Sequence, residues 1–169
     1  MAWSPTKSIL SPRAIPTNLL TYVTDATRQA DALTWAGGSS LKAFKTFSQS
    51  VANRTIPIFP SIAFSDDNDE QAFNGDIIEG LYSCTFEVSI QNASADTAST
   101  NARIYQKAIC SMIANCPTST LITNTGATNS VLLGLECGFE PIKTNDMQND
   151  FLQVFQIRAS YSLFDSQYE

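Results

Sequence analysis

Two stretches of the chain alternate between apolar and polar side chains, and this alternation restricts the fold more than any other feature of the sequence. In residues 81–91 the apolar positions are Tyr82, Cys84, Phe86, Val88 and Ile90. In residues 151–164 they are Phe151, Phe155, Ile157, Ala159, Tyr161 and Leu163, and only Gln153 breaks the alternation. Successive side chains of a β-strand point to opposite faces, so each stretch predicts a strand with one buried face. A sheet of such strands needs a second layer to cover its apolar face.

Two other stretches have the periodicity of amphipathic helices. In residues 16–33 apolar residues recur at steps of three and four, at Leu19, Val23, Ala26, Ala30 and Leu33. In residues 96–116 the predicted buried stripe is Ala98, Ala102, Tyr105, Ala108, Ile109, Met112 and Ile113. Asp96 or Thr97 is expected to cap this second helix, and Pro117 marks its end.

The segments between these elements have weaker patterns. Residues 41–54 combine helical and alternating spacing, so they are left open between helix and strand. Residues 56–64 alternate but contain Pro57 and Pro60, which indicates a strand at a sheet edge or at a bulge. The remaining predictions are a short strand at 120–123, a strand at 131–135 on Val131, Leu133 and Leu135, and polar loops at 65–80 and 142–150.

Together these elements predict an α+β fold. We expect a two-layer sandwich in which a mostly antiparallel sheet carries two main helices on one face. The polar face of the sheet is then free for solvent or for neighbouring molecules. We expect a single domain over residues 16–169, preceded by an extended N-terminal arm over residues 1–15, because Pro5 and Pro12 disfavour a helix there.

At 169 residues the chain can bury roughly 70% of its unfolded surface, so it needs neither a metal nor a disulfide to fold.

The charge of the chain is low and unevenly distributed. Residues 1–54 hold six basic and two acidic side chains, whereas residues 55–102 hold eight acidic and no basic ones. The net charge of −6 disfavours a function in which the protein binds nucleic acid tightly. Ser, Thr, Asn and Gln make up 56 residues and only 15% are charged, so the surface suits packing against other subunits.

Histidine is absent from the chain, which removes the commonest general base and the commonest metal ligand. The four cysteines form no CxxC pair and stand in apolar contexts, so we expect reduced, buried side chains. The N-terminus has no basic region followed by an apolar run, and we expect synthesis in a reducing cytoplasm, without a membrane span. We assign no catalytic, metal-binding or cofactor-binding residue.

An acidic cluster is the sharpest candidate for a site. It consists of Asp66, Asp67, Asp69, Glu70 and Asp76. The spacing fails for an EF-hand calcium loop, which needs Gly at the sixth position and Glu at the twelfth. Three other interpretations of the cluster remain open. It is a pair of carboxylates for glycoside hydrolysis, a solvated surface loop, or an interface or channel loop that repels DNA.

Two further regions are candidates for contacts between subunits. In the arm they are Trp3 and Pro5, since a lone large aromatic side chain has nothing local to pack on. In the second polar loop they are Lys143, Asn145 and Asp146. Docking of Trp3 on its own domain, and a plain surface role for the loop, are equally open.

The order of the elements resembles the tail terminator, or tail-completion, proteins of long-tailed bacteriophages. The matching pieces are the helix Ile15–Leu33, the strand Ile56–Phe64 that leads into the acidic stretch, the strand Tyr82–Gln91, the helix Asp96–Cys116 and the closing strand Phe151–Phe164. The resemblance covers about residues 15–165 and rests on order and pattern, not on a signature motif. The long arm and the extra residues at 35–54 depart from it and leave the member class open.

The resemblance implies a ring, commonly of six subunits, at the head-proximal end of the tail tube. Such a ring stops tube polymerisation, contacts the tail tube protein and the head–tail connector or neck proteins, and lets DNA pass without specific binding. It implies a structural component of the virion tail, assembled in the host cytoplasm, with no catalysis and no membrane. The alternatives are another head–tail neck or adaptor protein, a small carboxylate-dependent enzyme, and a monomeric binding module.

Overall fold

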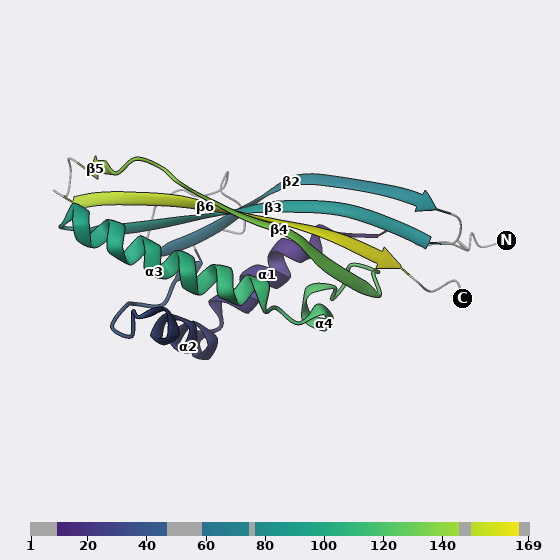
Figure 1. Ribbon diagram of the computed structural model, residues 1–169, viewed down its shortest axis with the longest axis horizontal. Helices are drawn as coiled ribbons and strands as arrows, with labels where there is room; N and C mark the ends of the chain where they lie inside the picture. The colour runs from purple at the N-terminus through teal and green to yellow at the C-terminus, as the bar shows by residue number, and fades with distance from the viewer. Residues whose placement is uncertain (1–9, 47–58, 75–76, 146–149, 166–169) are drawn as a thin grey trace.

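The computed structural model describes residues 10–46, 59–74, 77–145 and 150–165. The helices are α1 (Ala14–Thr24), α2 (Ala26–Ala36), α3 (Ala95–Ala114) and α4 (Thr118–Leu121). The strands are β1 (Lys45–Thr46), β2 (Ser61–Asn74), β3 (Ile77–Asn92), β4 (Asn129–Phe139), β5 (Lys143–Asn145) and β6 (Asp150–Asp165). In this part of the chain the helices lie on one side of the sheet (Figure 1), so the predicted α+β sandwich is confirmed.

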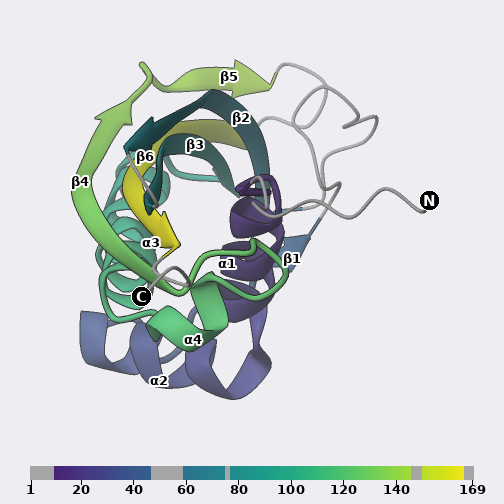
Figure 2. The ribbon, with the colours of Figure 1, turned by 90° about the vertical axis from the view of Figure 1, so that its right-hand side faces the viewer.

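The sheet is antiparallel except at one edge. Its order is β1-β2-β3-β6-β4, with β5 paired to β6 beside β4, and only the short pairing of β1 with β2 is parallel. Viewed along the strands, the sheet curves from β4 to β2 (Figure 2), as expected from the twist between neighbouring strands. The far ends of β2 and β3 extend beyond the helices (Figure 1).

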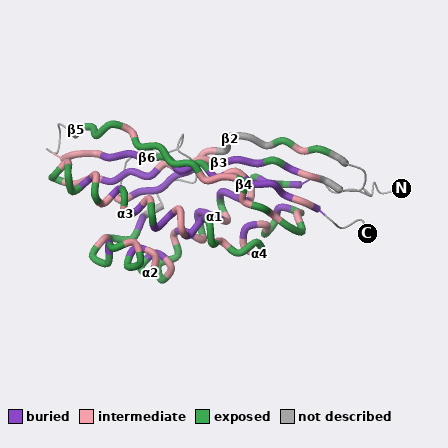
Figure 3. Tube along the Cα trace, viewed as in Figure 1, coloured by how far each residue is buried: buried purple, intermediate pink, exposed green. Residues whose placement is uncertain are grey.

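The core lies between β3, β6 and the helices. The register of β3 and β6 places Phe86 opposite Ile157 and Val88 opposite Phe155, all on the face that the helices cover. These four side chains are fully buried, and Figure 3 shows that burial is concentrated in the two central strands. Gln153, the exception to the alternation, is also buried, but its Nε2 donates to the carbonyl oxygen of Glu140 at 2.6 Å. A satisfied amide can therefore occupy an apolar face.

The predicted helix 16–33 is wrong in one respect, because it is two helices that meet at Asp25. The backbone of Asp25 is extended there, with ψ of 124°, and its side chain accepts a hydrogen bond from the backbone N–H of Arg28 at 2.9 Å. Asp25 is thus the N-cap of α2, and capping lets the chain turn without leaving N–H groups unsatisfied.

Helix α3 agrees with the predicted helix, and its whole predicted stripe is buried. Its N-cap is Ser94 and not Asp96 or Thr97: the Oγ of Ser94 accepts from the backbone N–H of Thr97 at 3.4 Å. Ser94 has extended backbone angles, which an N-cap requires, whereas Asp96 already lies in the first turn.

Three predictions between the main elements are wrong. The segment 120–123 is not a strand, because Thr118–Leu121 forms the short helix α4 directly after Pro117. The described residues of the stretch 65–80 are not a loop, since residues 65–74 belong to β2 and residues 77–80 to β3, and the two strands are paired. The predicted loop 142–150 contains β5, which pairs with β6. In the last two cases cross-strand pairing satisfies the backbone despite a polar sequence.

The start of the described chain belongs to the domain. Leu10 is buried, and its backbone N–H and carbonyl both bond to the side-chain amide of Gln71, at 3.1 and 2.9 Å. Residues 1–9 of the predicted arm lie outside the described residues. In the segment 41–54, Phe44 is buried and β1 forms a two-residue strand, and residues 47–54 lie outside the described residues.

Replacing Phe155 with alanine should cost about 3–5 kcal/mol of unfolding free energy, because the side chain is completely buried and leaves a cavity. The matched control is Phe139→Ala. The ring centre of Phe139 lies 5.3 Å from that of Phe155, but Phe139 is 38% exposed. Its replacement should therefore lower the unfolding free energy by only about 1 kcal/mol. Urea unfolding of both variants measures the difference. Equal losses would contradict the assignment of the inner face.

Asp25→Ala should lower the unfolding free energy by about 1 kcal/mol, because it removes the cap of α2. Asp31→Ala, in the same helix but exposed, should cost about 0.5 kcal/mol or less. Thermal unfolding followed by circular dichroism compares the two. An Asp31 variant as unstable as the Asp25 variant would show that the break between α1 and α2 does not depend on the cap.

Candidate functional site

The face of the sheet away from the helices carries mainly small, neutral polar side chains. Ser83, Ser89 and Ser162 are buried there because longer side chains lie across them. Arg158 donates from Nη2 to the Oγ of Ser83 at 3.3 Å, and the Oγ of Ser162 lies 3.3 Å from the Oε1 of Glu79. Among the described residues no helix covers this face (Figure 1), so it is a wide surface open to a partner.

The acidic cluster lies on a strand and not on the predicted loop. Asp66, Asp67, Asp69 and Glu70 all belong to β2, with an irregularity in register between Asp66 and Asn68. Asp69 is paired with Tyr82 and Glu70 with Leu81, and Glu70 is exposed. Asp76 lies outside the described residues.

The strand places four of these acids in succession along β2, and Glu70 is the one whose side chain the structure describes. Within the described residues, no group of three or more His, Cys, Asp or Glu side chains is placed to hold a metal ion. Four hollows of about 260 to 370 Å³ lie on the described part of the chain, and Glu70 lines none of these four.

The other predicted interface residues are only partly described. Lys143 begins β5, is exposed, and forms an ion pair in which its Nζ lies 2.6 Å from the Oε2 of Glu140. Asn145 ends the same strand, and Trp3, Pro5 and Asp146 lie outside the described residues.

A surface that the sequence analysis missed surrounds Trp35, near the end of α2. Its side chain is 60% exposed, and the Nζ of Lys107 on α3 lies 4.5 Å from the centre of its ring. A groove of about 330 Å³ runs from this pair to Tyr22 and Arg28 between α2 and α3. The guanidinium of Arg28 stacks 3.7 Å above the ring of Tyr22 and separates this groove from a second, of about 370 Å³. The sequence offered one signal for this surface: Trp35 lies outside the apolar stripe of its helix.

A second missed surface lies on the open face of the sheet, where apolar side chains face solvent. Leu81 is 43% exposed and Val131 48% exposed, and both are paired with Ser162 of the intervening strand. Leu133 is 57% exposed and lies where the register of β4 shifts, between Leu132 and Gly134. This bulge explains why Val131, Leu133 and Leu135, which alternate in sequence, do not share one buried face: only Leu135 packs against the core.

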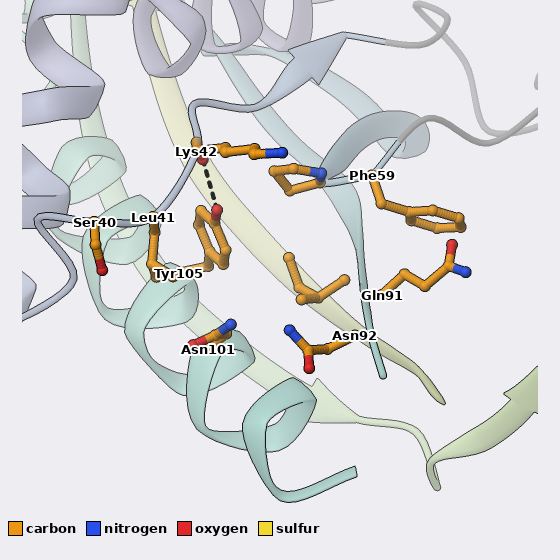
Figure 4. A pocket seen from close by; sticks show the side chains of 10 residues that line it. Ser40, Leu41, Lys42, Phe59, Gln91, Asn92, Asn101 and Tyr105 are labelled. Atoms are coloured by element: carbon orange, nitrogen blue, oxygen red, sulfur yellow. Dashed lines mark hydrogen bonds between the residues drawn. The ribbon is translucent and has the colours of Figure 1, made fainter. Parts of the chain in front are cut away.

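A hollow of about 260 Å³ lies between the start of α3, the end of β3 and the segment before β1 (Figure 4). Asn92 and Asn101 reach toward it, and the hydroxyl of Tyr105 donates to the backbone carbonyl of Lys42 at 2.6 Å. Burial raises the pKa of Tyr105 to about 12, so this hydroxyl stays protonated at neutral pH. The lining offers hydrogen bonds from amides and one lysine, with no carboxylate among its residues.

The cysteines are free thiols, as expected, but they are not all buried. Cys84 is buried, Cys110 and Cys116 are partly exposed, and Cys137 on the edge strand β4 is exposed. Burial raises the pKa of Cys110 and of Cys116 to about 11, and it also raises the pKa of Cys137. The prediction of burial is therefore wrong for Cys137, because a side chain of an edge strand has no neighbour on one side.

The two layers carry opposite net charge. In the helices and their connections, residues 10–44 and 93–128, the basic side chains are Arg13, Arg28, Lys42, Arg103 and Lys107. Three acids accompany them, which leaves a net charge of +2. The described residues of the strands and their connections hold ten acidic and three basic side chains, a net charge of −7. The asymmetry along the sequence therefore becomes an asymmetry between the two layers.

Comparisons with known proteins give no relative. No protein-family model matches the chain, and no curated protein matches it in sequence.

Among the described residues, every helix is too short or too polar to cross a lipid bilayer.

Alkylation of the thiols should follow their exposure and pKa. At pH 8 a thiol with a pKa of about 11 has roughly a hundredfold less thiolate than one at 9.0, so Cys110 and Cys116 should react slowly. Exposed Cys137 should be modified first, and raising the pH to 10 should speed the reaction of Cys110. Mass spectrometry of iodoacetamide-treated protein over time measures each rate. Modification of Cys110 as fast as Cys137 would contradict this order.

Proposed function

We propose that this protein is a tail terminator of a long-tailed bacteriophage. Its copies form a ring, commonly of six subunits, at the head-proximal end of the tail tube, stop tube elongation and join the tail to the neck. The order of elements supports the proposal, because two antiparallel strands, a long helix and closing antiparallel strands follow the early helices, although the resemblance names one early helix where the structure has α1 and α2. The protein is then a structural component of the virion, assembled in the host cytoplasm.

The observation that carries the proposal is the unlike character of the two layers. Helices with a net positive charge cover one face of the sheet, while the other face is open, small-residue and bordered by acids. A ring of identical subunits joins two different surfaces of each copy and closes by rotation. Opposite charges on these surfaces favour that head-to-tail contact over a contact between like faces.

The same charges suit a passage for DNA. Each copy carries a formal charge of −6, and ten acids stand on the strand layer with only three bases. A channel bordered by such a layer repels phosphates and does not retain a polymer that has to leave quickly. The proposal therefore includes DNA passing through the ring without specific binding.

Removing the gene from the phage that encodes it tests this function. Electron microscopy of the tails should show tubes of uncontrolled length without attached heads, and supplying the protein should restore one length. Tails of normal length that fail only to attach heads would indicate another neck or adaptor protein. Normal virions would contradict both.

A further inference from the structure

We propose that two specific patches on opposite sides of the subunit form the contact between neighbouring copies, an inference that rests on the proposed ring. The first, called the leucine patch, consists of Leu81, Val131 and Leu133 on the strand layer. The second, called the tryptophan patch, consists of Trp35 and Lys107 on the helical layer. The leucine patch of one copy packs against the tryptophan patch of the next copy.

The leucine patch is apolar with an acidic border. Leu81 and Val131 are separated by one strand, so their Cα atoms lie about 10 Å apart on the same face, with the small, buried Ser162 between them. On the other side of Leu81 the paired residue is the exposed Glu70. Adjacent apolar side chains on a solvent-facing sheet are typical of a contact surface.

The free edge of β4 strengthens this assignment. Among the described residues β4 pairs only with β6, so its other side has unpaired backbone groups along eleven residues. Natural edge strands are protected by lysine, proline or a short length, and β4 has neither residue type. It carries one charged side chain, Glu136, and its bulge at Leu133 exposes an apolar side chain. A neighbouring molecule that covers Val131 and Leu133 would remove this liability.

The tryptophan patch has a complementary group at its centre, because Trp35 is aromatic and carries a lysine ammonium over its ring, and the groove beside it is lined by both Arg28 and Asp31. The ring of Trp35 is 60% exposed and holds the ammonium group of Lys107 above it, and Arg28 lies along the same groove. Exposed tryptophan next to a cation is a frequent centre of binding energy in protein interfaces. Because α2 lies on the far side of the helical layer from the sheet (Figure 1), one copy cannot bring its own two patches together.

Charge selects a second copy as the occupant of each patch. A contact between two leucine patches would bring Glu70 of both copies together, whereas a contact between a leucine patch and a tryptophan patch brings Glu70 near Lys107. The two patches differ in shape and charge, so their contact is heterologous, which is the type that generates rings.

Complementation between two variants tests the contact. Variant one, Trp35→Ala with Lys107→Glu, loses the tryptophan patch, and variant two, Leu81→Lys, loses the leucine patch. Each variant alone should remain a monomer, because every contact between two copies of the same variant lacks one of the two patches. An equimolar mixture should form a dimer of twice the 18.4 kDa subunit mass, because one intact patch of each kind remains. Sedimentation velocity measures the masses, and circular dichroism confirms folding.

Matched controls carry the same change of charge elsewhere. Arg13→Glu alters an exposed base of the helical layer, and Gln156→Lys alters an exposed residue of the same open sheet face. Both should assemble like the unaltered protein. Rings from either patch variant, or a mixture that stays monomeric, would overturn the proposal.

The outcomes separate this inference from the proposed function. If the patch variants form rings and still restore tail length, the terminator function stands and the assignment of surfaces is wrong. If the unaltered protein stays monomeric at all concentrations up to the millimolar range, the contact is contradicted, while tail length in the phage still decides the function. If the mixture dimerises but tails without the protein are normal, the contact is real and the function is wrong.

Discussion

The pairing of β3 with β6 is the interaction on which the rest of the structure depends. Their register runs without a shift from Ile78 opposite Asp165 to Asn92 opposite Phe151. Because side chains alternate between faces, this register places Phe86 and Ile157 toward the helices and Leu81 and Ser162 toward the open side. A slip by one residue would exchange the two faces and bury the polar set. The proposed contact surface is thus the reverse side of the core.

The fold could be predicted where one periodicity was strong. Strands β3 and β6 and helix α3 lie where the sequence places them, since each has a long apolar stripe with a polar opposite face. The acidic strand β2 could not be predicted from its own pattern, because its many polar residues are held by backbone pairing with β3, the next strand along the chain. The break at Asp25 was missed for a different reason: the apolar spacing continues across a residue that caps the second helix.

The candidate surfaces were predictable only in part. The uneven charge was visible in the sequence, and the fold converts it into two oppositely charged layers. The exposure of Val131 and Leu133 depends on a bulge in β4, which simple alternation does not reveal. The contact of Trp35 with Lys107 joins two helices that are distant in sequence, so no local pattern could report it. Assembly surfaces depend on tertiary packing more than core strands do.

Cross-linking of the assembled, unaltered protein tests the central claim most directly. Half of the protein is labelled with ¹⁵N, so that links between copies are distinguished from links within one copy. A zero-length reagent that joins lysine to carboxylate should link Lys107 of one copy to Glu70 or Glu79 of another, because the helical layer meets the strand layer. Links between copies that join only strand-layer residues, such as Lys143 with Glu136, would contradict the account.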